Sequence, residues 1–437
     1  MVLVLKVANE TMVTAAPDLL RKLFDAATDA ALPEKCLGAF LPAAPKGRVV
    51  VVGAGKAAAA MARAVEDNWT HGQLEGLVVT RYGHGVPTQH IEVIEASHPV
   101  PDQAGMDASQ RILETVSNLT EDDLVLCLIS GGGSALLSLP ADGISMADKQ
   151  ALTSDLLRSG ATITEMNCVR KHLSKIKGGR LAMACHPARV VSLIISDVPG
   201  DDLSSIASGA TVPDPSTYAD ARDVLEKYSI MPAASISQHL KAEPDETAKP
   251  GDARFDTVEN ILIATPQMAL EAAALVAANA GYTPMILSDR IEGETRDVAQ
   301  MHGAIARQVA AHGQPLKAPA VLLSGGETTV TITGKGGRGG PNSEFLLALA
   351  ISLDGHPGIH AIACDTDGID GSEDNAGAVI GPGTIARGHA LGLDAKAYLA
   401  NNDAYSFFQG VNGLVAPGPT LTNVNDFRAI VVEGVKP

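Results

Sequence analysis

Short apolar runs rich in valine and isoleucine alternate with alanine-rich segments of helical length along most of the chain. Apolar runs of this length are typical of buried strands, and the segments between them have the length of helices. The alternation favours βαβ units and a mostly parallel sheet with helices on both faces, an α/β fold. The predicted strands are 48–52, 77–81, 91–96, 124–129, 189–196, 260–264, 283–287, 321–324, 329–333 and 359–364, and the predicted helices include 56–68, 107–119, 266–280 and 295–311.

A polar, proline-containing stretch, 241–256, separates two groups of these elements and shows no periodicity. Such a composition is typical of a linker. The chain has 437 residues, which is enough for two or three domains. We therefore predict two α/β domains, residues 1–245 and 246–437. Residues 328–333 and the glycines after them resemble a hairpin, so a mixed sheet is expected in the second domain.

Charge and composition exclude several classes of partner. Lys and Arg number 33 against 50 Asp and Glu, a net charge of −17, so neither nucleic acid nor an anionic membrane surface is an expected partner. Aromatic residues make up 3%, too few for a surface that stacks single-stranded bases. The five cysteines are scattered without a C-x-x-C pair, which argues against a disulfide framework or a structural zinc site. No apolar run has the length of a membrane span, and the N-terminus turns polar too soon for a signal peptide, so a cytoplasmic location is predicted.

Ligands bind at the carboxyl ends of strands in open α/β sheets, so the residues after each predicted strand are the first candidates. Gly53 and Gly55 follow the first strand in a G-x-G-x-x-A pattern similar to a dinucleotide-binding turn. Lys56 stands inside the turn, and the next strand ends in Thr80 and Arg81, which offer no acid for a ribose hydroxyl. A lysine at a helix N-terminus can bind an anion instead; a tight turn with a solvated lysine is the alternative.

A second glycine-rich loop follows the apolar strand 124–129 and precedes an apolar helix. It reads Ser130-Gly131-Gly132-Gly133-Ser134. Successive glycine N–H groups can converge on an anion, and the two hydroxyl groups add donors. We expect this loop to bind phosphate; a flexible turn is the alternative.

Carboxylates follow the strand 189–196. Asp197 emerges directly from it, and Asp201 and Asp202 come after a Pro-Gly turn. Oxygen ligands suit Mg²⁺, and a carboxylate can act as the general base for a hydroxyl nucleophile. Asp201 and Asp202 could equally cap a short helix, so Asp197 is the sharper candidate.

A second acidic loop follows the strand 359–364. It contains Asp365, Asp367, Asp370, Glu373 and Asp374. The spacing matches part of a calcium loop but does not complete its twelve-residue frame. Binding of a Mg²⁺–nucleotide or of substrate hydroxyl groups is expected, with a solvated acidic turn as the alternative.

Gly325, Gly326 and Glu327 end another strand, and the glycine-rich basic loop that follows carries Arg338. An arginine flanked by glycines is expected to have few packing partners, so we expect it to bind a carboxylate or a transferred phosphoryl group. Asn342 is expected to cap the next helix.

A local cluster of cations stands out in this acidic chain. One predicted helix, which ends at Gly178-Gly179, has five cations in or near it: Arg170, Lys171, Lys175, Lys177 and Arg180. The cluster suits an anionic substrate or nucleotide, and favourable placement of cations at a helix C-terminus is the alternative.

Together these segments resemble the glycerate 2-kinases of the MOFRL type. The resemblance runs from about residue 15 to the end, through GAGKAAAAMA, SGGGSALL, NCVRKHLSKIKGGRLA, ISDVPGDDLSSIASGATVPDPST, LLSGGETTVTITGKGGRGGPNSE, DTDGIDGSEDNAGA, NNDAYSFF and GPTLTNVNDFRAI. It implies ATP- and Mg²⁺-dependent phosphorylation of D-glycerate to 2-phosphoglycerate. It also implies a Rossmann-like three-layer N-terminal domain, a mixed α/β C-terminal domain and an active site in the cleft between them. One departure is Leu421, where the family pattern leads us to expect a glycine.

By this resemblance the catalytic residues are Lys56, Asp197 and Arg338. Asp197 would accept the hydroxyl proton, Lys56 and Arg338 would hold the phosphoryl oxygens, and Asp197 with Asp365 would bind Mg²⁺. The residues expected to bind substrate or nucleotide are Gly53, Gly55, Ser130, Gly131, Gly132, Gly133, Ser134, Arg170, Lys171, Lys177, Gly325, Gly326, Glu327, Asn342, Asp365 and Asp367.

Two other functions stay open. Members of this family are often labelled hydroxypyruvate reductases, but an NAD(P)H-dependent enzyme would need the ribose-binding acid that the first glycine turn lacks. A non-catalytic protein that binds organic acids is disfavoured by the many acids and glycines at strand ends. A homo-oligomer is compatible with the sequence.

Overall fold

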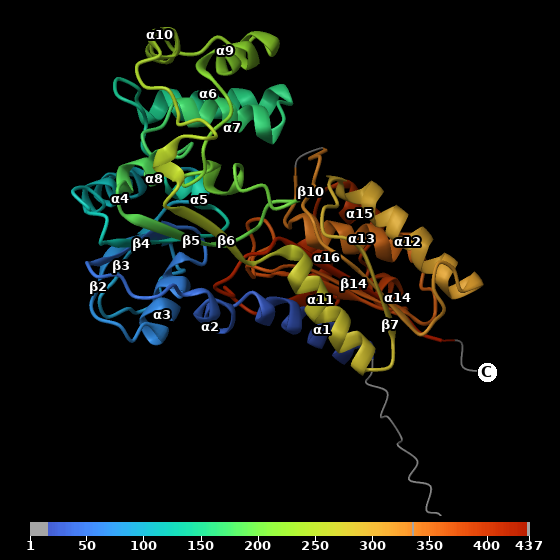
Figure 1. Ribbon diagram of the computed structural model, residues 1–437. Helices are drawn as coiled ribbons and strands as arrows, with labels where there is room; N and C mark the ends of the chain where they lie inside the picture. The colour runs from blue at the N-terminus through green and yellow to red at the C-terminus, as the bar shows by residue number, and fades with distance from the viewer. Residues whose placement is uncertain (1–15, 334–335, 435–437) are drawn as a thin grey trace, which may run out of the picture. The chain divides into compact units, whose positions relative to one another are not determined.

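The computed structural model describes residues 16–333 and 336–434 (Figure 1). Its internal contacts divide the chain into two compact units. The parallel-sheet unit contains Ala30–Pro266 and Pro419–Asn425, and the described part of the mixed-sheet unit contains residues 16–29, Gln267–Gly418 and 426–434. The N-terminal residues, for which no signal peptide is predicted, and residues 334–335 of the glycine-rich loop lie outside the described ranges.

The parallel-sheet unit is built on six strands that all run parallel, in the order β3-β2-β1-β4-β5-β6. This is the strand order of the Rossmann fold, in which ligands bind where the order reverses, here between β1 and β4. The predicted Rossmann-like architecture is therefore confirmed. The strands are β1 (Val49–Ala54), β2 (Leu74–Arg81), β3 (Glu92–Ala96), β4 (Leu124–Ile129), β5 (Arg189–Ile195) and β6 (Val258–Ala264).

Helices cover both faces of this sheet, which explains why β1 and β4 are continuous apolar runs without exposed positions. Helix α3 (Ala58–Asn68) lies on one face (Figure 1). On the other face, α4 (Gln103–Thr115), α5 (Gly133–Leu136) and α8 (Arg180–Cys185) share one buried apolar cluster with the strands. A short helix, α2 (Pro33–Cys36), and the 3₁₀ turns Gly38–Phe40, Ile206–Ser208 and Ala253–Phe255 complete the unit.

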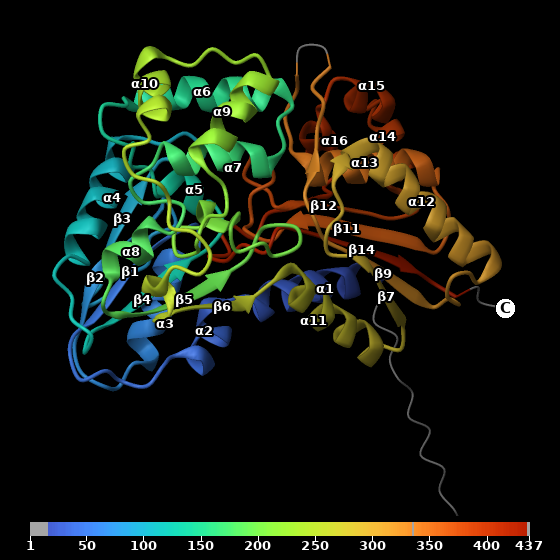
Figure 2. The same cartoon turned by 45° about the horizontal axis from the view of Figure 1, so that its top comes forward.

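A further layer of helices lies beyond α5 and α8 (Figures 1 and 2). It has its own apolar core around Leu156, Tyr218 and Ile236. The helix predicted through the cationic cluster is in fact two helices, α7 and α8, because the first helix ends at His172, with Leu173 at its C-cap position. Gly178 and Gly179 adopt φ of 59° and 79° just before α8, so they do not cap α7. The helices of this layer are α6 (Met146–Ser159), α7 (Ile163–His172), α9 (Tyr218–Lys227) and α10 (Ala234–Ala242).

The stretch 241–256 packs against this unit through a hydrogen bond and an ion pair. Glu246 accepts a hydrogen bond from the His172 ring, and Asp245 pairs with Arg180. The predicted boundary at residues 245 and 246 therefore differs from the observed division, because β6 follows this stretch and pairs with β5 before the chain leaves the unit after Pro266.

The mixed-sheet unit has the order β13-β12-β11-β14-β9-β7, in which β7 and β9 run parallel and the other neighbours run antiparallel. The mixed sheet expected for the C-terminal part is confirmed. The expected hairpin includes residues 334–335, which lie outside the described residues; within them, β10 (Thr328–Thr329) pairs in parallel with β8 (Gly293–Glu294). The main strands are β7 (Thr283–Ser288), β9 (Ala320–Ser324), β11 (Ile359–Asp365), β12 (Gly377–Ile380), β13 (Leu414–Val415) and β14 (Asp426–Val432).

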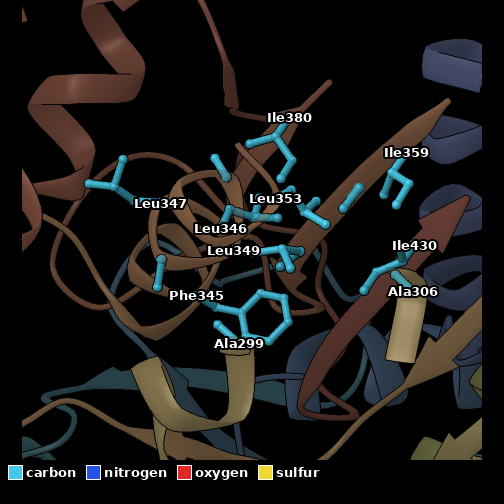
Figure 3. Close-up of a cluster of buried hydrophobic side chains, with 14 of the residues drawn as sticks. Ala299, Ala306, Phe345, Leu346, Leu347, Leu349, Leu353, Ile359, Ile380 and Ile430 are labelled. Carbon is cyan, nitrogen blue, oxygen red and sulfur yellow. The ribbon is translucent and has the colours of Figure 1, made fainter. Parts of the chain in front are cut away.

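Helices α1 and α11 lie on one side of this second sheet and α12 and α13 on the other (Figure 2). The Phe24 ring of α1 lies 6.1 Å from that of Phe427, which ties the first helix to the last strand. Figure 3 shows the core on the other side, a buried apolar cluster that includes Phe345 and Leu349 of the helix after Gly340 and Ile430 of the last strand. The helices are α1 (Ala16–Ala30), α11 (Pro266–Asn279), α12 (Thr295–His312), α13 (Pro341–Leu353), α14 (Thr384–Ala390), α15 (Ala395–Ala400) and α16 (Ala404–Gly410).

Within the described ranges, none of these helices combines the length and the apolar character needed to cross a membrane.

A buried ion pair fixes the helical layer. Lys171 Nζ lies 3.3 Å from Asp214 Oδ1, and both side chains are almost fully buried. The same carboxylate accepts hydrogen bonds from Ser216 and Thr247, so it joins α7 to two loops. This differs from the predicted binding role of Lys171, because its ammonium group already has a partner inside the fold.

We expect Asp214→Ala to lower the free energy of unfolding by about 3–5 kcal/mol, because it leaves the Lys171 charge buried without its partner. The matched control is Asp142→Ala, which removes the partner of Lys175 from an exposed pair and should cost less than about 1 kcal/mol. Urea unfolding followed by circular dichroism measures both. Equal losses in the two variants would contradict the structural role of the buried pair.

Candidate active site

The loops after β1 and β4 are interlocked at the point where the strand order reverses. The backbone N–H of Lys56 donates to Gly131 O at 2.8 Å, and that of Ala57 donates to Ser130 Oγ at 3.0 Å. The N–H of Gly55 donates to a carbonyl group of β2. These N–H groups of the G-x-G-K turn are therefore used within the protein and are not presented to a pyrophosphate.

Gly53 and Gly55 are explained by packing. A Cβ on Gly53 would collide with the Leu128 backbone in the neighbouring strand, and one on Gly55 would collide with Ser130. Both glycines permit close approach between chain segments. The structure thus gives them a different role from the predicted contact with a ligand.

The glycine loop after β4 lies between the two main catalytic candidates. A Cβ on Gly131 would meet the Asp197 carboxylate and the Asn423 amide group, and one on Gly132 would meet the His98 ring and, at 3.4 Å, the side-chain carbon Cγ of Lys56. Gly132 itself has φ of 80°, the left-handed conformation that favours glycine. Lys56 and Asp197 consequently border consecutive glycines of one loop.

Asp197 is held by a segment that is remote in sequence, Pro419–Asn425, which we call the returning segment. Asn423 Nδ2 donates to Asp197 Oδ2 at 3.0 Å, and Asn425 Nδ2 donates to the Asp197 carbonyl oxygen at 2.8 Å. Sequence reasoning missed both asparagines, because no local pattern reveals that this segment packs beside β5. Their only sequence signal is a pair of amide side chains in a stretch that precedes a strand.

Leu421 lies in the returning segment with φ of 64°. An L-residue with a side chain is disfavoured in this left-handed region, whereas glycine adopts it readily. The observed conformation therefore gives a physical reason for the glycine that the family pattern led us to expect.

The loop after Asp197 caps a short helical turn. Asp202 accepts hydrogen bonds from the Ser204 backbone and from the hydroxyl groups of Ser204 and Ser205. These contacts support the capping alternative for Asp202 and leave Asp197 as the acid beside the glycine loop.

Strained backbone follows that turn. Ala207 and Ser208 have φ of 49° and 56°, in the left-handed region that costs a non-glycine residue about 1–2 kcal/mol. Ala207 packs on the glycine loop, at the position where a Cβ on Gly133 would stand. Strain of this kind persists only where the surroundings over-determine it, which is common at functional sites.

Cations gather beside the same loop. Lys177 is buried, and its Nζ donates to the Ser134 carbonyl oxygen at 2.7 Å. Lys177, Lys149 and Arg170 line one cavity, whose volume is about 420 Å³. Burial, reinforced by the charge of Arg170, lowers the pKa of Lys149 to about 8, and burial with both neighbouring charges holds the pKa of Lys177 well below its usual value. The sequence pattern did not single out Lys149.

In the mixed-sheet unit, Asp370 caps helix α13. Its carboxylate accepts hydrogen bonds from the backbone N–H groups of Asn342 and Ser343, at 2.9 and 2.8 Å. Asn342 is therefore not the cap that was predicted, because the helix begins at Pro341 and Gly340 occupies the N-cap position. Burial raises the pKa of Asp370 to about 6, and the nearby charge of Asp426 acts in the same direction.

A buried arginine organises the strand ends of this unit. Arg428 donates to Asp426 Oδ2 at 2.5 Å and to the Gly325 carbonyl oxygen at 3.1 Å. Asn342 Nδ2 donates to the other Asp426 oxygen at 2.7 Å. Gly326 has φ of 98° and packs against Ile291. Gly325 and Asn342 are thus joined to Arg428 and Asp426 in one buried network, whereas Glu327 is exposed.

The acidic loop after β11 is folded on itself. Asp365 Oδ1 accepts the Asp367 backbone N–H at 2.9 Å, and Asp367 Oδ1 accepts that of Ile369 at 2.8 Å. Across the described ranges, no group of three or more His, Cys, Asp and Glu side chains is placed to hold a metal ion.

Arg338 has more partners than expected from its flanking glycines. Its guanidinium group donates to Glu373 Oε2 at 2.6 and 3.0 Å and stacks over the Tyr405 ring, 4.1 Å from its centroid. The side chain is half exposed. The expectation of few packing partners is wrong, because residues far along the chain supply them.

Comparisons with known proteins agree with this architecture. Residues 19–241 match the family described as a domain of unknown function, DUF4147, and residues 320–426 match the MOFRL family. These two matches cover most of the parallel-sheet unit and much of the mixed-sheet unit.

Full-length relatives are also similar. The chain is 52% identical over 419 residues to a putative hydroxypyruvate reductase of Agrobacterium vitis, with 96% of this chain and 95% of that protein covered. It is 42% identical over 393 residues to the glycerate 2-kinase of Pyrococcus horikoshii, with 89% and 88% covered. The crystal structure of glycerate kinase from Thermotoga maritima superimposes with a TM-score of 0.85 at 40% identity, covering 95% of this chain and 99% of that one. The resemblance drawn from the motifs is confirmed: the chain belongs to the glycerate kinase family of the MOFRL type.

Proposed function

We propose that this protein transfers the γ-phosphoryl group of ATP to the 2-hydroxyl group of D-glycerate, giving 2-phosphoglycerate and ADP. One observation carries the proposal: Lys56 and Asp197 border the consecutive glycines Gly132 and Gly131. A phosphoryl group bound at these glycines would lie beside the Lys56 side chain and the Asp197 carboxylate. The relative named glycerate 2-kinase supports the substrate.

In the proposed step, the glycerate hydroxyl oxygen attacks the γ-phosphorus, and the bond from this phosphorus to the oxygen that bridges it to the β-phosphate breaks. Asp197 accepts the hydroxyl proton, and ADP leaves with the bridging oxygen. Lys56 offsets negative charge on the transferred oxygens, the kind of electrostatic stabilisation on which phosphoryl transfer depends. Asn423 holds Asp197 Oδ2 and so orients the carboxylate.

Mg²⁺ would be held by few protein ligands. Mg²⁺ at nucleotide sites is commonly bound by one or two carboxylates together with phosphate oxygens and water. Asp197, a partly exposed carboxylate beside the glycine loop, fits such a site. When bound, the ion neutralises charge on the phosphates. Asp365, the other predicted ligand, uses one oxygen in its own turn.

Arg338 is the candidate for a second cation at the phosphoryl group. Its planar guanidinium group can bind two oxygens at once, which a lysine cannot do. It would have to leave Glu373 to do so. The Arg338 side chain is half exposed, and the oxygens of a phosphoryl group would replace the Glu373 carboxylate as its charged partner. The location of the active site in the cleft between the two domains stays a prediction.

A hydroxypyruvate reductase is the second candidate, because the relative from Agrobacterium vitis carries that label. A nicotinamide dinucleotide would need N–H groups at the first glycine turn and an acid at the end of β2. The N–H groups of Gly55, Lys56 and Ala57 already donate within the protein, and β2 ends in Arg81. These contacts favour the kinase.

We expect the purified protein to form ADP and 2-phosphoglycerate from D-glycerate, ATP and Mg²⁺. A coupled assay for ADP, together with ³¹P NMR of the product, measures this directly. The same preparation should oxidise NADH or NADPH with hydroxypyruvate at no appreciable rate. Reductase turnover without ATP consumption would contradict the proposal.

We expect Lys56→Ala to lower kcat by about 100-fold or more, by analogy with the loss of a preorganised group that stabilises charge in the transition state. Arg63→Ala is the control, because Arg63 lies on the following helix α3 in an exposed pair with Asp67. It should keep the wild-type kcat. Both are measured as steady-state kcat with saturating ATP and D-glycerate. A Lys56→Ala enzyme with normal turnover would reduce the lysine to a solvated turn residue.

A further inference from the structure

A cavity of about 420 Å³ in the parallel-sheet unit contains three cations and no carboxylate. Lys149 comes from α6, Arg170 from α7, and Lys177 from the turn before α8. In a chain with 50 acidic residues, a cavity with cations but no carboxylate in its lining needs a physical reason. Burying charge without a partner is costly unless a ligand supplies the opposite charge.

The cations lack anionic partners in the part of the chain that the structure describes. Lys149 Nζ is buried and makes no hydrogen bond there. Lys177 Nζ donates to a neutral carbonyl group, that of Ser134, and Arg170 takes part in none of the ion pairs formed by the described residues. The three groups repel one another, which contributes to the lowered pKa values of Lys149 and Lys177.

A second cavity of the same unit provides the contrast. It has a volume of about 370 Å³ and is lined by Lys175 and Arg180. There Lys175 pairs with Asp142 and Arg180 pairs with Asp245. The absence of partners around Lys149 is thus a property of the first cavity and not of cations throughout this unit.

The first cavity also has an apolar wall. Val100 and Leu157 line it and are each 60% exposed, although both are large apolar side chains. Pro99, Pro101 and Met146 extend the same lining. A flat heteroaromatic ring placed against these side chains would remove apolar surface from water.

The cavity reaches the proposed reaction centre. Gly132 and Ser134 of the glycine loop line it, and Gly132 borders Lys56. A ligand that binds the three cations can therefore place a terminal phosphate over Gly132, beside Lys56.

We propose that this cavity is the nucleotide site: Lys149, Arg170 and Lys177 bind the polyphosphate chain of ATP, and Val100 and Leu157 cover the adenine ring. The inference rests on the proposed kinase function and extends it by assigning the nucleotide to one cavity. Three uncompensated cations match a polyphosphate, whereas glycerate carries a single carboxylate. The cavity volume falls in the range typical of ligands larger than a three-carbon acid.

Binding of three probes to the full chain tests the assignment by isothermal titration calorimetry. The probes are a non-hydrolysable ATP analogue with Mg²⁺, inorganic tripolyphosphate, and D-glycerate. We expect Lys149→Met to raise the Kd of the ATP analogue and of tripolyphosphate by about 10-fold or more, because a charged contact is lost, and to leave the Kd of D-glycerate unchanged. Lys175→Met, from the second cavity, is the matched control and should change none of them.

A second variant separates the two ends of the ligand. Leu157→Ala should weaken the ATP analogue several-fold but not tripolyphosphate, since only the analogue has a base to cover. Thermal unfolding of each variant verifies its fold. Unchanged affinity of the ATP analogue in Lys149→Met, or a loss confined to D-glycerate, overturns the assignment while the kinase function stands. A wild-type protein that phosphorylates no glycerate contradicts the proposed function itself.

Discussion

The contact between Gly131, Asp197 and Asn423 is the constraint on which the site depends. Gly131 has no room for a side chain, because the Asp197 carboxylate and the Asn423 amide group occupy that space. The asparagine comes from the returning segment, which joins the parallel-sheet unit although it lies more than two hundred residues beyond Asp197. A glycine loop, a strand end and a remote segment therefore fix one carboxylate. The residue that follows the returning segment, Asp426, begins the last strand of the mixed-sheet unit.

Strained backbone and cations without carboxylate partners surround this contact. Ala207 and Ser208 are held in left-handed backbone against the glycine loop, while Lys149, Arg170 and Lys177 are held close together without carboxylates. Each feature costs stability in the absence of a ligand. The apolar clusters beneath the sheet and in the helical layer supply the stability that offsets this cost. A site whose cations repel one another when no ligand is bound is suited to an anionic substrate.

Much of the parallel sheet could be predicted from sequence, because its strands are local apolar runs; the observed bounds of β4 match the prediction. The catalytic candidates Lys56 and Asp197 were found because each follows such a run. Strand β14 was missed, since its buried polar residues Asp426 and Arg428 interrupt the apolar pattern and are tolerated only because they pair with each other. The roles of Lys149 and Asn423 depend on neighbours that are distant in sequence, and a single sequence does not reveal these neighbours.

The central claim is that Asn423 acts by positioning Asp197, and a double-mutant cycle on kcat tests it most directly. The cycle compares the wild type with Asn423→Ala, Asp197→Asn and the variant that carries both changes. Asn423→Ala should lower kcat about 10-fold in the wild type and cause almost no further loss once Asp197 is replaced, because nothing is left to orient. Independent losses, with the double variant slower than Asp197→Asn by the full effect of Asn423→Ala, would contradict the account.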